Sequence, residues 1–135
     1  MKITTSFGLI NIISTDIAEI IVDEGLEVTL EIVEEYDAIL AQNFSGNYAV
    51  LINKINSYRY AFEALLTIGS AENQKAAAII SYGVESEQQT IDLKALRRID
   101  NLNIKEFSGL NLGRASAIKW LNEQLTVVNS SETVT

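Results

Sequence analysis

The chemistry open to this chain is limited first by the residue types that it lacks. The 135-residue sequence contains no Cys and no His. It therefore has no thiol nucleophile, no disulfide framework and no Ser-His-Asp relay. Most zinc and haem sites also use these two residue types. We therefore expect no metal, no cofactor and no enzymatic activity. An enzyme that uses Tyr, Lys or carboxylate groups for catalysis stays open as an alternative, after the two binding functions given below.

The densest group of polar side chains follows a short apolar run. Tyr48–Ile52 is typical of a strand covered on both faces, and a polar segment comes directly after it. Ligands of open α/β sheets gather at the carboxyl ends of parallel strands. We therefore predict a loop that binds a partner or a ligand, made up of Asn53, Lys54, Asn56, Ser57, Tyr58 and Arg59.

Three interpretations of this loop stay open. A hydroxyl and two cations before a helix can hold a phosphate or a carboxylate. Ser57 can itself be phosphorylated, which would add negative charge at the start of the helix. The simplest interpretation is structural: Asn56 or Ser57 caps the helix, which is an ordinary role of Asn and Ser, and the two cations stay in solvent.

Aromatic residues near the same edge of the sheet predict a different site. A pocket between the second helix and the sheet would be lined by Tyr58, Tyr60, Phe62 and Tyr82, with the two cations of the loop at its mouth. It would hold an anionic or lipid-like molecule in a cavity of roughly 300 Å³ or more. The structural alternative is that these tyrosines are packed, half-buried side chains.

The elements that must position these groups follow from hydrophobic periodicity. Residues 7–14 and 17–22 predict a β-hairpin. Helical spacing predicts helices that begin after Thr29, at Tyr60, at Glu85 and at Asn111, the last ending at Leu125. Short apolar runs predict strands at 48–52, 76–81 and 103–107. The order β-β-α-β-α-β-α-β-α predicts an α/β domain with a mixed sheet and, through right-handed crossovers, helices on both faces.

The length and charge of the chain limit the number of domains and the kinds of partner that we expect. One domain over residues 1–125 is expected, followed by a polar tail at 126–135 that frays. The formal net charge of −8 disfavours nucleic-acid binding, which needs clustered Lys and Arg. No apolar run approaches the ~20 residues that span a bilayer. The N-terminus has no export signal, so we expect a cytoplasmic protein.

Two segments resemble a known family. The letters LINKINSY, Leu51 to Tyr58, and AIKWL, Ala117 to Leu121, resemble segments of small bacterial proteins, common in Bacteroidetes, of the SpoIIAA-like or STAS/SEC14 group. The resemblance covers about residues 7–125 and implies the SpoIIAA-like fold, a mixed sheet with helices on both faces. Its SEC14-like branch implies an apolar ligand pocket.

The resemblance also implies a switch. In the anti-sigma factor antagonists of this fold, a partner kinase phosphorylates a serine in the loop before the second helix, and this changes partner binding. Ser57 is the matching position, although the antagonist pattern Asp-Ser-Ser/Thr-Gly is replaced here by the residues from Asn56 to Arg59.

We therefore expect a non-enzymatic, STAS-like regulatory or protein-interaction module. It would present the loop 53–59 and the helix after it to a protein partner, with Ser57 as the switch. The alternative is a small-molecule-binding protein that uses the aromatic pocket. Homo-oligomers formed through a strand or helix edge stay open, and no residue pattern names the partner.

Overall fold

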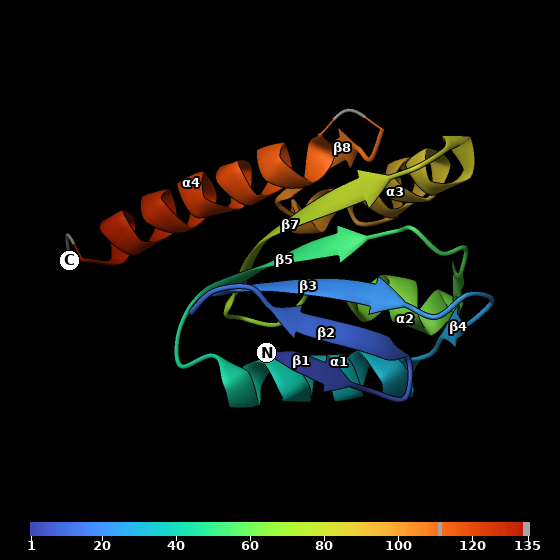
Figure 1. Cartoon of the computed structure of the whole chain (residues 1–135), viewed down its shortest axis with the longest axis horizontal. Helices are drawn as coiled ribbons and strands as arrows, with labels where there is room; N and C mark the ends of the chain where they lie inside the picture. Colours follow the sequence, from blue (N-terminus) through green and yellow to red (C-terminus); the bar gives the residue numbers. More distant parts are fainter. Residues whose placement is uncertain (111, 134–135) are drawn as a thin grey trace.

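A six-stranded mixed sheet forms the centre of the molecule (Figure 1). The computed structural model describes residues 1–110 and 112–133, with side chains as far as residue 130. In spatial order, the strands are β1 (Lys2–Thr4), β2 (Gly8–Ile12), β3 (Ile17–Val22), β5 (Tyr48–Asn53), β7 (Gln74–Ser81) and β8 (Ile104–Ser108). The pairs β1–β2 and β2–β3 are antiparallel, and the remaining pairs are parallel. The predicted α/β class and mixed sheet are confirmed.

The described part of the chain forms four α-helices beside the sheet. They are α1 (Leu30–Asn43), α2 (Phe62–Thr67), α3 (Val84–Leu96) and α4 (Gly113–Thr133), and the short 3₁₀ helix η1 (Arg98–Asp100) follows α3. Strands β4 (Glu27–Val28) and β6 (Arg59–Tyr60) pair with each other outside the main sheet. The strands β1, β4 and β6 were not predicted, because two or three residues are too few to show a period.

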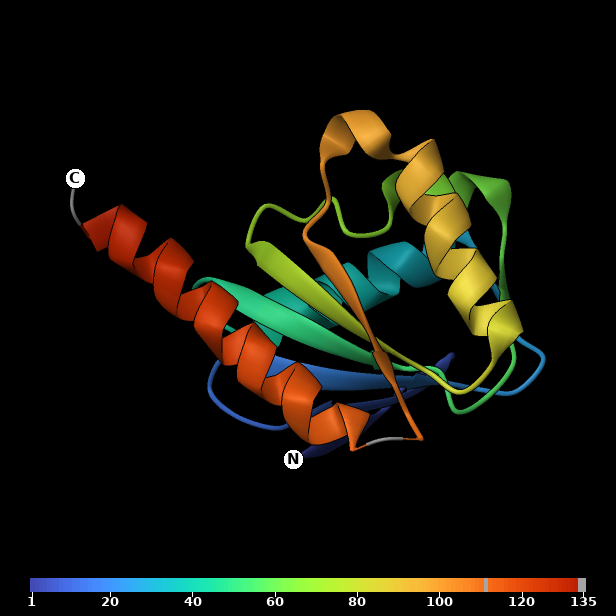
Figure 2. The same ribbon diagram turned by 90° about the horizontal axis from the view of Figure 1, so that it is seen from above.

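Three helices cover one face of the sheet, and α4 covers the other (Figures 1 and 2). The parallel strands β3, β5, β7 and β8 are added in a single direction. Crossovers of one hand then place all their helices on the same face. The sequence analysis expected the crossovers themselves to place helices on both faces. Only α4, which follows the last strand, lies on the second face.

Small side chains let α4 pack closely on the sheet. The strands offer Ala49, Ala76 and Ala78, and the helix offers Ala117, Leu121 and Leu125, all of which are buried. The helix also continues past Leu125, where the sequence analysis placed the start of the tail, and Asn47 donates a hydrogen bond to Asn129 at 3.2 Å. The expected helix start at Asn111 and the last two residues of the expected tail lie outside the described residues.

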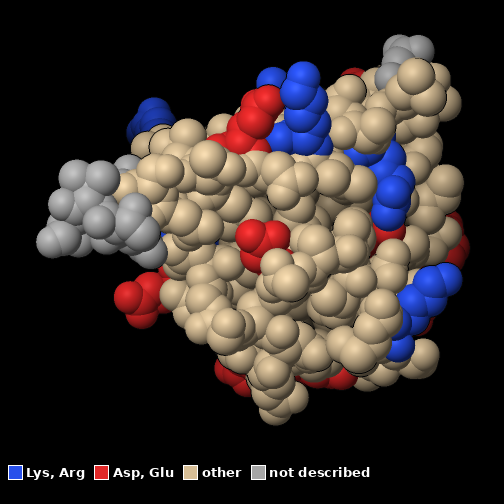
Figure 3. Space-filling view, turned by 60° about the vertical axis from the view of Figure 1, so that its left-hand side comes forward, with Lys and Arg blue, Asp and Glu red and all other residues tan. Residues whose placement is uncertain are grey.

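The surface carries scattered charges. On the face shown in Figure 3, acidic and basic side chains lie singly or in small groups among uncharged residues. None of the described helices combines the length and hydropathy that crossing a bilayer requires. Among the described residues, no group of three or more His, Cys, Asp or Glu side chains could hold a metal ion.

The start of α4 tolerates no side chain. A Cβ added at Gly113 would overlap the carbonyl oxygen of Ser108 at the end of β8. We expect the substitution Gly113→Ala to lower the free energy of unfolding by about 2 kcal/mol, because the helix must move away from the strand. Urea denaturation followed by circular dichroism measures this value.

The control is Gly46→Ala, at a glycine whose added Cβ would meet no atom within 4 Å. This variant is expected to stay within about 0.5 kcal/mol of the wild type. Equal losses in the two variants would contradict the close approach of α4 to β8.

Candidate functional site

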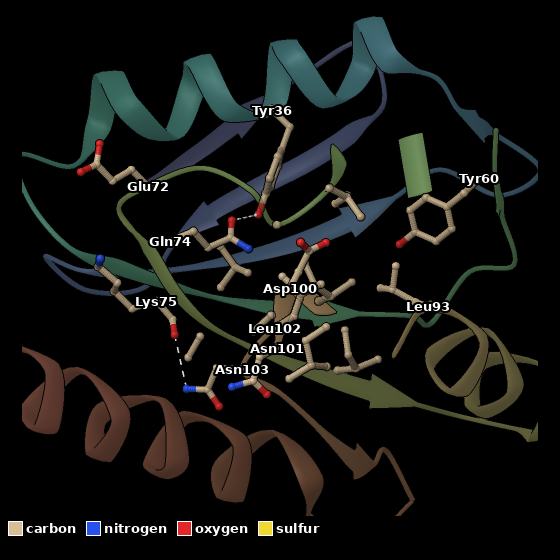
Figure 4. Close-up of a pocket in the computed structure, with 18 residues that line it drawn as sticks. Tyr36, Tyr60, Glu72, Gln74, Lys75, Leu93, Asp100, Asn101, Leu102 and Asn103 are labelled. Carbon is tan, nitrogen blue, oxygen red and sulfur yellow. Dashed lines mark hydrogen bonds between the residues drawn. The ribbon is translucent and has the colours of Figure 1, made fainter. Parts of the chain in front are cut away.

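A cavity of about 280 Å³ lies between the helices and the sheet (Figure 4). It forms beside α2, which has six residues and a length of about 9 Å. The neighbouring strand β7 has eight residues and a length of roughly 26 Å. A helix this short cannot cover the sheet between α1 and α3. The volume is near the lower end of the range of roughly 300–1,000 Å³ that is usual for ligand pockets.

Most of the cavity wall is apolar. The sheet contributes Val50, Ile52, Ala77, Ile79 and Ile104, and the helical side contributes Ile68, Leu93 and Leu102. These side chains come from β5, β7 and β8, from the end of α2, from α3 and from the segment after η1. The cavity wall is therefore built mainly from the stretch of chain between β5 and β8.

A few polar groups converge on this apolar space. The hydroxyl of Tyr36 donates a hydrogen bond to Oε1 of Gln74 at 2.5 Å. The side-chain nitrogen of Gln74, Nε2, then has no partner among the described residues. The hydroxyls of Tyr58 and Tyr60 lie 3.3 Å apart, so one of their two protons remains for a third group. Figure 4 shows Tyr36, Gln74, Tyr60 and Asp100 directed toward the middle of the cavity.

A buried arginine fixes the rim of the cavity. Arg97, which is 5% exposed, donates to the carbonyl oxygens of Leu65 and Ile68 at 3.0 and 2.7 Å. It also donates to Ser70 Oγ at 2.9 Å and to the carboxylate of Asp100 at 2.5 Å. The end of α2 is thus fastened to η1. The sequence analysis missed Arg97, because an arginine near the end of a polar helix shows no pattern that predicts burial.

A second polar cluster lies beneath α3. Lys54 is 5% exposed, and its Nζ donates to Oε1 of Gln89 at 2.9 Å. The same nitrogen lies 5.4 Å from the ring centres of both Tyr58 and Tyr60, a cation–π arrangement. Burial lowers the pKa of Lys54 to about 8, against the opposing effect of the Glu106 carboxylate. Lys54 is therefore held inside the protein and does not face a partner.

The other residues of the predicted loop point in different directions. Asn53 turns to the α4 side and donates to Glu19 at 3.0 Å, while Asn56 donates to the carbonyl oxygen of Val22 at 2.9 Å. Ser57 is exposed, and Arg59 forms an exposed ion pair with Glu27 at 3.5 Å. The structure therefore does not bring the six predicted side chains together on one surface.

The capping interpretation of this loop is wrong. The N-cap of α2 is Ala61, and no side chain caps the helix. Strand β6 lies between Ser57 and the helix, so neither Asn56 nor Ser57 reaches the helix start. The interpretation in which the start of this helix holds a phosphate or a carboxylate loses its geometric basis for the same reason.

Only part of the predicted aromatic pocket lines the cavity. Tyr60 does, and Tyr58 lines a smaller hollow of about 30 Å³ beside it. Phe62 is 61% exposed. Tyr82 packs with the α4-side cluster, because it follows Ser81 and strand side chains alternate between faces. Neither Lys54 nor Arg59 is at the mouth of the cavity.

An ion pair on the α4 side joins β3 to the start of α4. Glu19 is buried and accepts hydrogen bonds from Arg114 at 3.0 and 3.3 Å, and from Asn53 and Asn11. Burial raises the pKa of Glu19, but the bonds from Arg114 and the two amides outweigh it and hold this pKa below its ordinary value. The pair fixes the orientation of α4 on the sheet, and the sequence analysis did not foresee it.

No family model, curated protein or solved structure matches this chain. The interpretation of the cavity therefore rests on its own residues.

The buried amine of Lys54 predicts an unusual dependence of stability on pH. Its folded-state pKa of about 8 lies below the ordinary lysine value of 10.5, so between these values the unfolded state binds the extra proton. Stability contributed by this group therefore increases as the pH rises. Relative to the variant Lys54→Met, the wild type should gain roughly 2 kcal/mol of unfolding free energy between pH 7 and pH 10.

Urea denaturation at several pH values gives this difference. The control is Lys94→Met, which removes an exposed amine from α3 and should leave the difference from the wild type constant over the same range. A constant difference for Lys54→Met as well would show that its amine is not buried.

Proposed function

We propose that this protein is a non-enzymatic, cytoplasmic binding protein that holds a small molecule in the cavity beside α2. The observation that carries the proposal is the set of hydrogen-bonding groups of Tyr60 and Gln74 directed into a space whose walls are mainly apolar. Ligand sites usually combine apolar walls with a few convergent polar groups of this kind.

The energetics of the cavity favour the same function. A cavity of this size with polar lining is filled by water when no ligand is present. An apolar ligand body gains affinity when it displaces poorly ordered water from the wall formed by Ile52, Ile79 and Ile104. The polar groups then fix the orientation of the ligand. The geometry is thus better suited to a small molecule than to the flat contact surface of a protein partner.

We also infer a SpoIIAA-like, STAS-type relationship. It is supported by the two segments LINKINSY and AIKWL and by a leading hairpin that is followed by alternating helices and strands. The SEC14-like branch of that group would suit a ligand-binding role.

A cavity-filling variant tests the binding function. Ala77 is buried on β7 and lines the cavity, so Ala77→Leu should fill part of the space. In a fragment screen by ¹H–¹⁵N NMR, hits on the wild type should shift the side-chain amide of Gln74 and the backbone amides of residues 102–104. Binding to Ala77→Leu should be at least tenfold weaker, because about three heavy atoms of the new side chain occupy the ligand's place.

The control variant is Ala115→Leu, which adds the same atoms on the exposed side of α4 and should bind the fragments as the wild type does. Fragments that shift only amides far from the cavity, or that bind Ala77→Leu unchanged, would overturn the proposal.

A protein-interaction module switched at Ser57 is the second candidate function. Ser57 is exposed, and its backbone N–H donates to the Glu24 carboxylate at 2.6 Å. The N–H of Gly25 donates to the Ser57 carbonyl oxygen at 2.7 Å. Ile55, two residues away, is 57% exposed and offers an apolar contact to a partner. A phosphate on Ser57 would repel Glu24 and release the turn before β4.

The substitution Ser57→Asp mimics that charge. We expect hydrogen exchange at the Gly25 amide to become at least tenfold faster in Ser57→Asp, because like charges separate the two loops, and to stay unchanged in Ser57→Ala. Equal exchange in all three proteins, together with unchanged partner capture, would remove the switch.

A further inference from the structure

We propose that the ligand of the cavity is a small organic cation, an amine or amidinium compound, whose N–H groups bind the free carboxylate oxygen of Asp100. The inference rests on the proposed function and names the chemical class of its ligand. It departs from the anionic ligand that the sequence analysis considered.

The charged residues that line the cavity indicate the charge of the ligand. Three charged residues line it, Glu72, Lys75 and Asp100, of which two are acidic. Figure 4 shows the side chains of Glu72 and Lys75 extending away from the cavity, whereas the carboxylate of Asp100 is directed toward its middle. Of these three groups, the one that a ligand meets inside is therefore negative.

The expected anion-binding groups lie elsewhere. Lys54 is buried beneath α3 with Gln89 as its partner, and Arg59 pairs with Glu27 at the surface. Neither lines the cavity. An anionic ligand would therefore lose its hydration without gaining a cationic partner there, and such a loss is costly.

One oxygen of the Asp100 carboxylate is available to accept a hydrogen bond from a ligand. Its Oδ2 forms an ion pair with Arg97 Nε, while Oδ1 has no partner among the described residues. Arg97 directs its other hydrogen bonds to Leu65, Ile68 and Ser70, and it is not part of the cavity wall. The side chain of Asp100 is 52% exposed, so a ligand can reach it. One oxygen thus fixes the orientation, and the other is available.

The aromatic lining favours the same class of ligand. Tyr36 lines the cavity, and the faces of aromatic rings attract cations. The amide oxygen of Gln74 and the tyrosine hydroxyls can accept further N–H bonds. The net charge of −8 gives the whole chain a field that attracts cations. The apolar part of the ligand would lie against Ile79 and Ile104.

A matched set of probes tests the charge preference on the intact chain. Benzylamine, benzamidine, benzyl alcohol and benzoate share one ring and differ in the charge of the attached group. Each is titrated near pH 7 while ¹H–¹⁵N NMR follows the side-chain amide of Gln74 and the backbone amides of residues 102–104. The two cations should bind with a Kd at least tenfold lower than that of benzyl alcohol, and benzoate should bind more weakly than all three.

Variants then locate the charge that is responsible. Asp100→Asn keeps an acceptor for Arg97 but removes the charge, and it should abolish the tenfold preference for the cations over benzyl alcohol. The control Glu123→Gln removes one exposed negative charge from α4 and should change each Kd by less than twofold. Thermal unfolding of both variants shows whether the rim stays folded.

The outcomes separate the two proposals. Benzoate binding as tightly as benzylamine, four equal affinities, or an unchanged preference in folded Asp100→Asn would overturn the cationic ligand and leave a binding cavity of another specificity. If none of the probes shifts the cavity amides in the wild type, both the cationic ligand and the proposed function are overturned. The comparison among probes needs no variant, so it stands even if Asp100→Asn fails to fold.

Discussion

The short length of α2 determines how completely α1, α2 and α3 cover their face of the sheet. Parallel strands added in one direction place α1, α2 and α3 on a single face. The middle helix has only six residues, so its neighbours cannot close over β7. Arg97 binds the end of α2 to η1 and so holds together two segments that border the cavity. The cavity is thus a consequence of connection lengths as much as of side-chain shape.

Among the residues that the structure describes, three buried charged side chains are stabilised in three different ways. Arg97 is surrounded by carbonyl, hydroxyl and carboxylate acceptors, which suit its fixed donors. Glu19 accepts from a guanidinium and two amides and keeps its charge. Lys54 has one amide oxygen and two aromatic rings, and its charged form is correspondingly weakened. Of the two buried groups Glu19 and Lys54, the one with fewer hydrogen-bond partners is the one whose pKa burial shifts toward the neutral form.

Much of the framework could be predicted from the sequence, whereas the site could be predicted only in part. The apolar run Tyr48–Ile52 gave the position of β5, because a strand buried on both faces needs apolar residues throughout. Lys54 was misplaced because a polar residue after such a run is usually exposed, and nothing local shows that α3 covers it. Tyr82 was assigned to the wrong face, since the side-chain direction depends on where β7 ends. The inward carboxylate of Asp100 depends on Arg97, which also binds the end of α2 and the turn after it, more than 25 residues earlier in the chain.

β8 is an edge strand of the sheet, so its side chains affect whether a strand of another chain can pair with it. An edge strand leaves backbone donors and acceptors on which another chain can assemble into a longer sheet. If two copies of β8 met about a two-fold axis, residues of the same face would lie opposite one another. A register centred on Lys105 would set two ammonium groups face to face, and one centred on Glu106 would set two carboxylates face to face. The adjacent opposite charges of Lys105 and Glu106 therefore disfavour these two pairings of β8 with a second copy of itself.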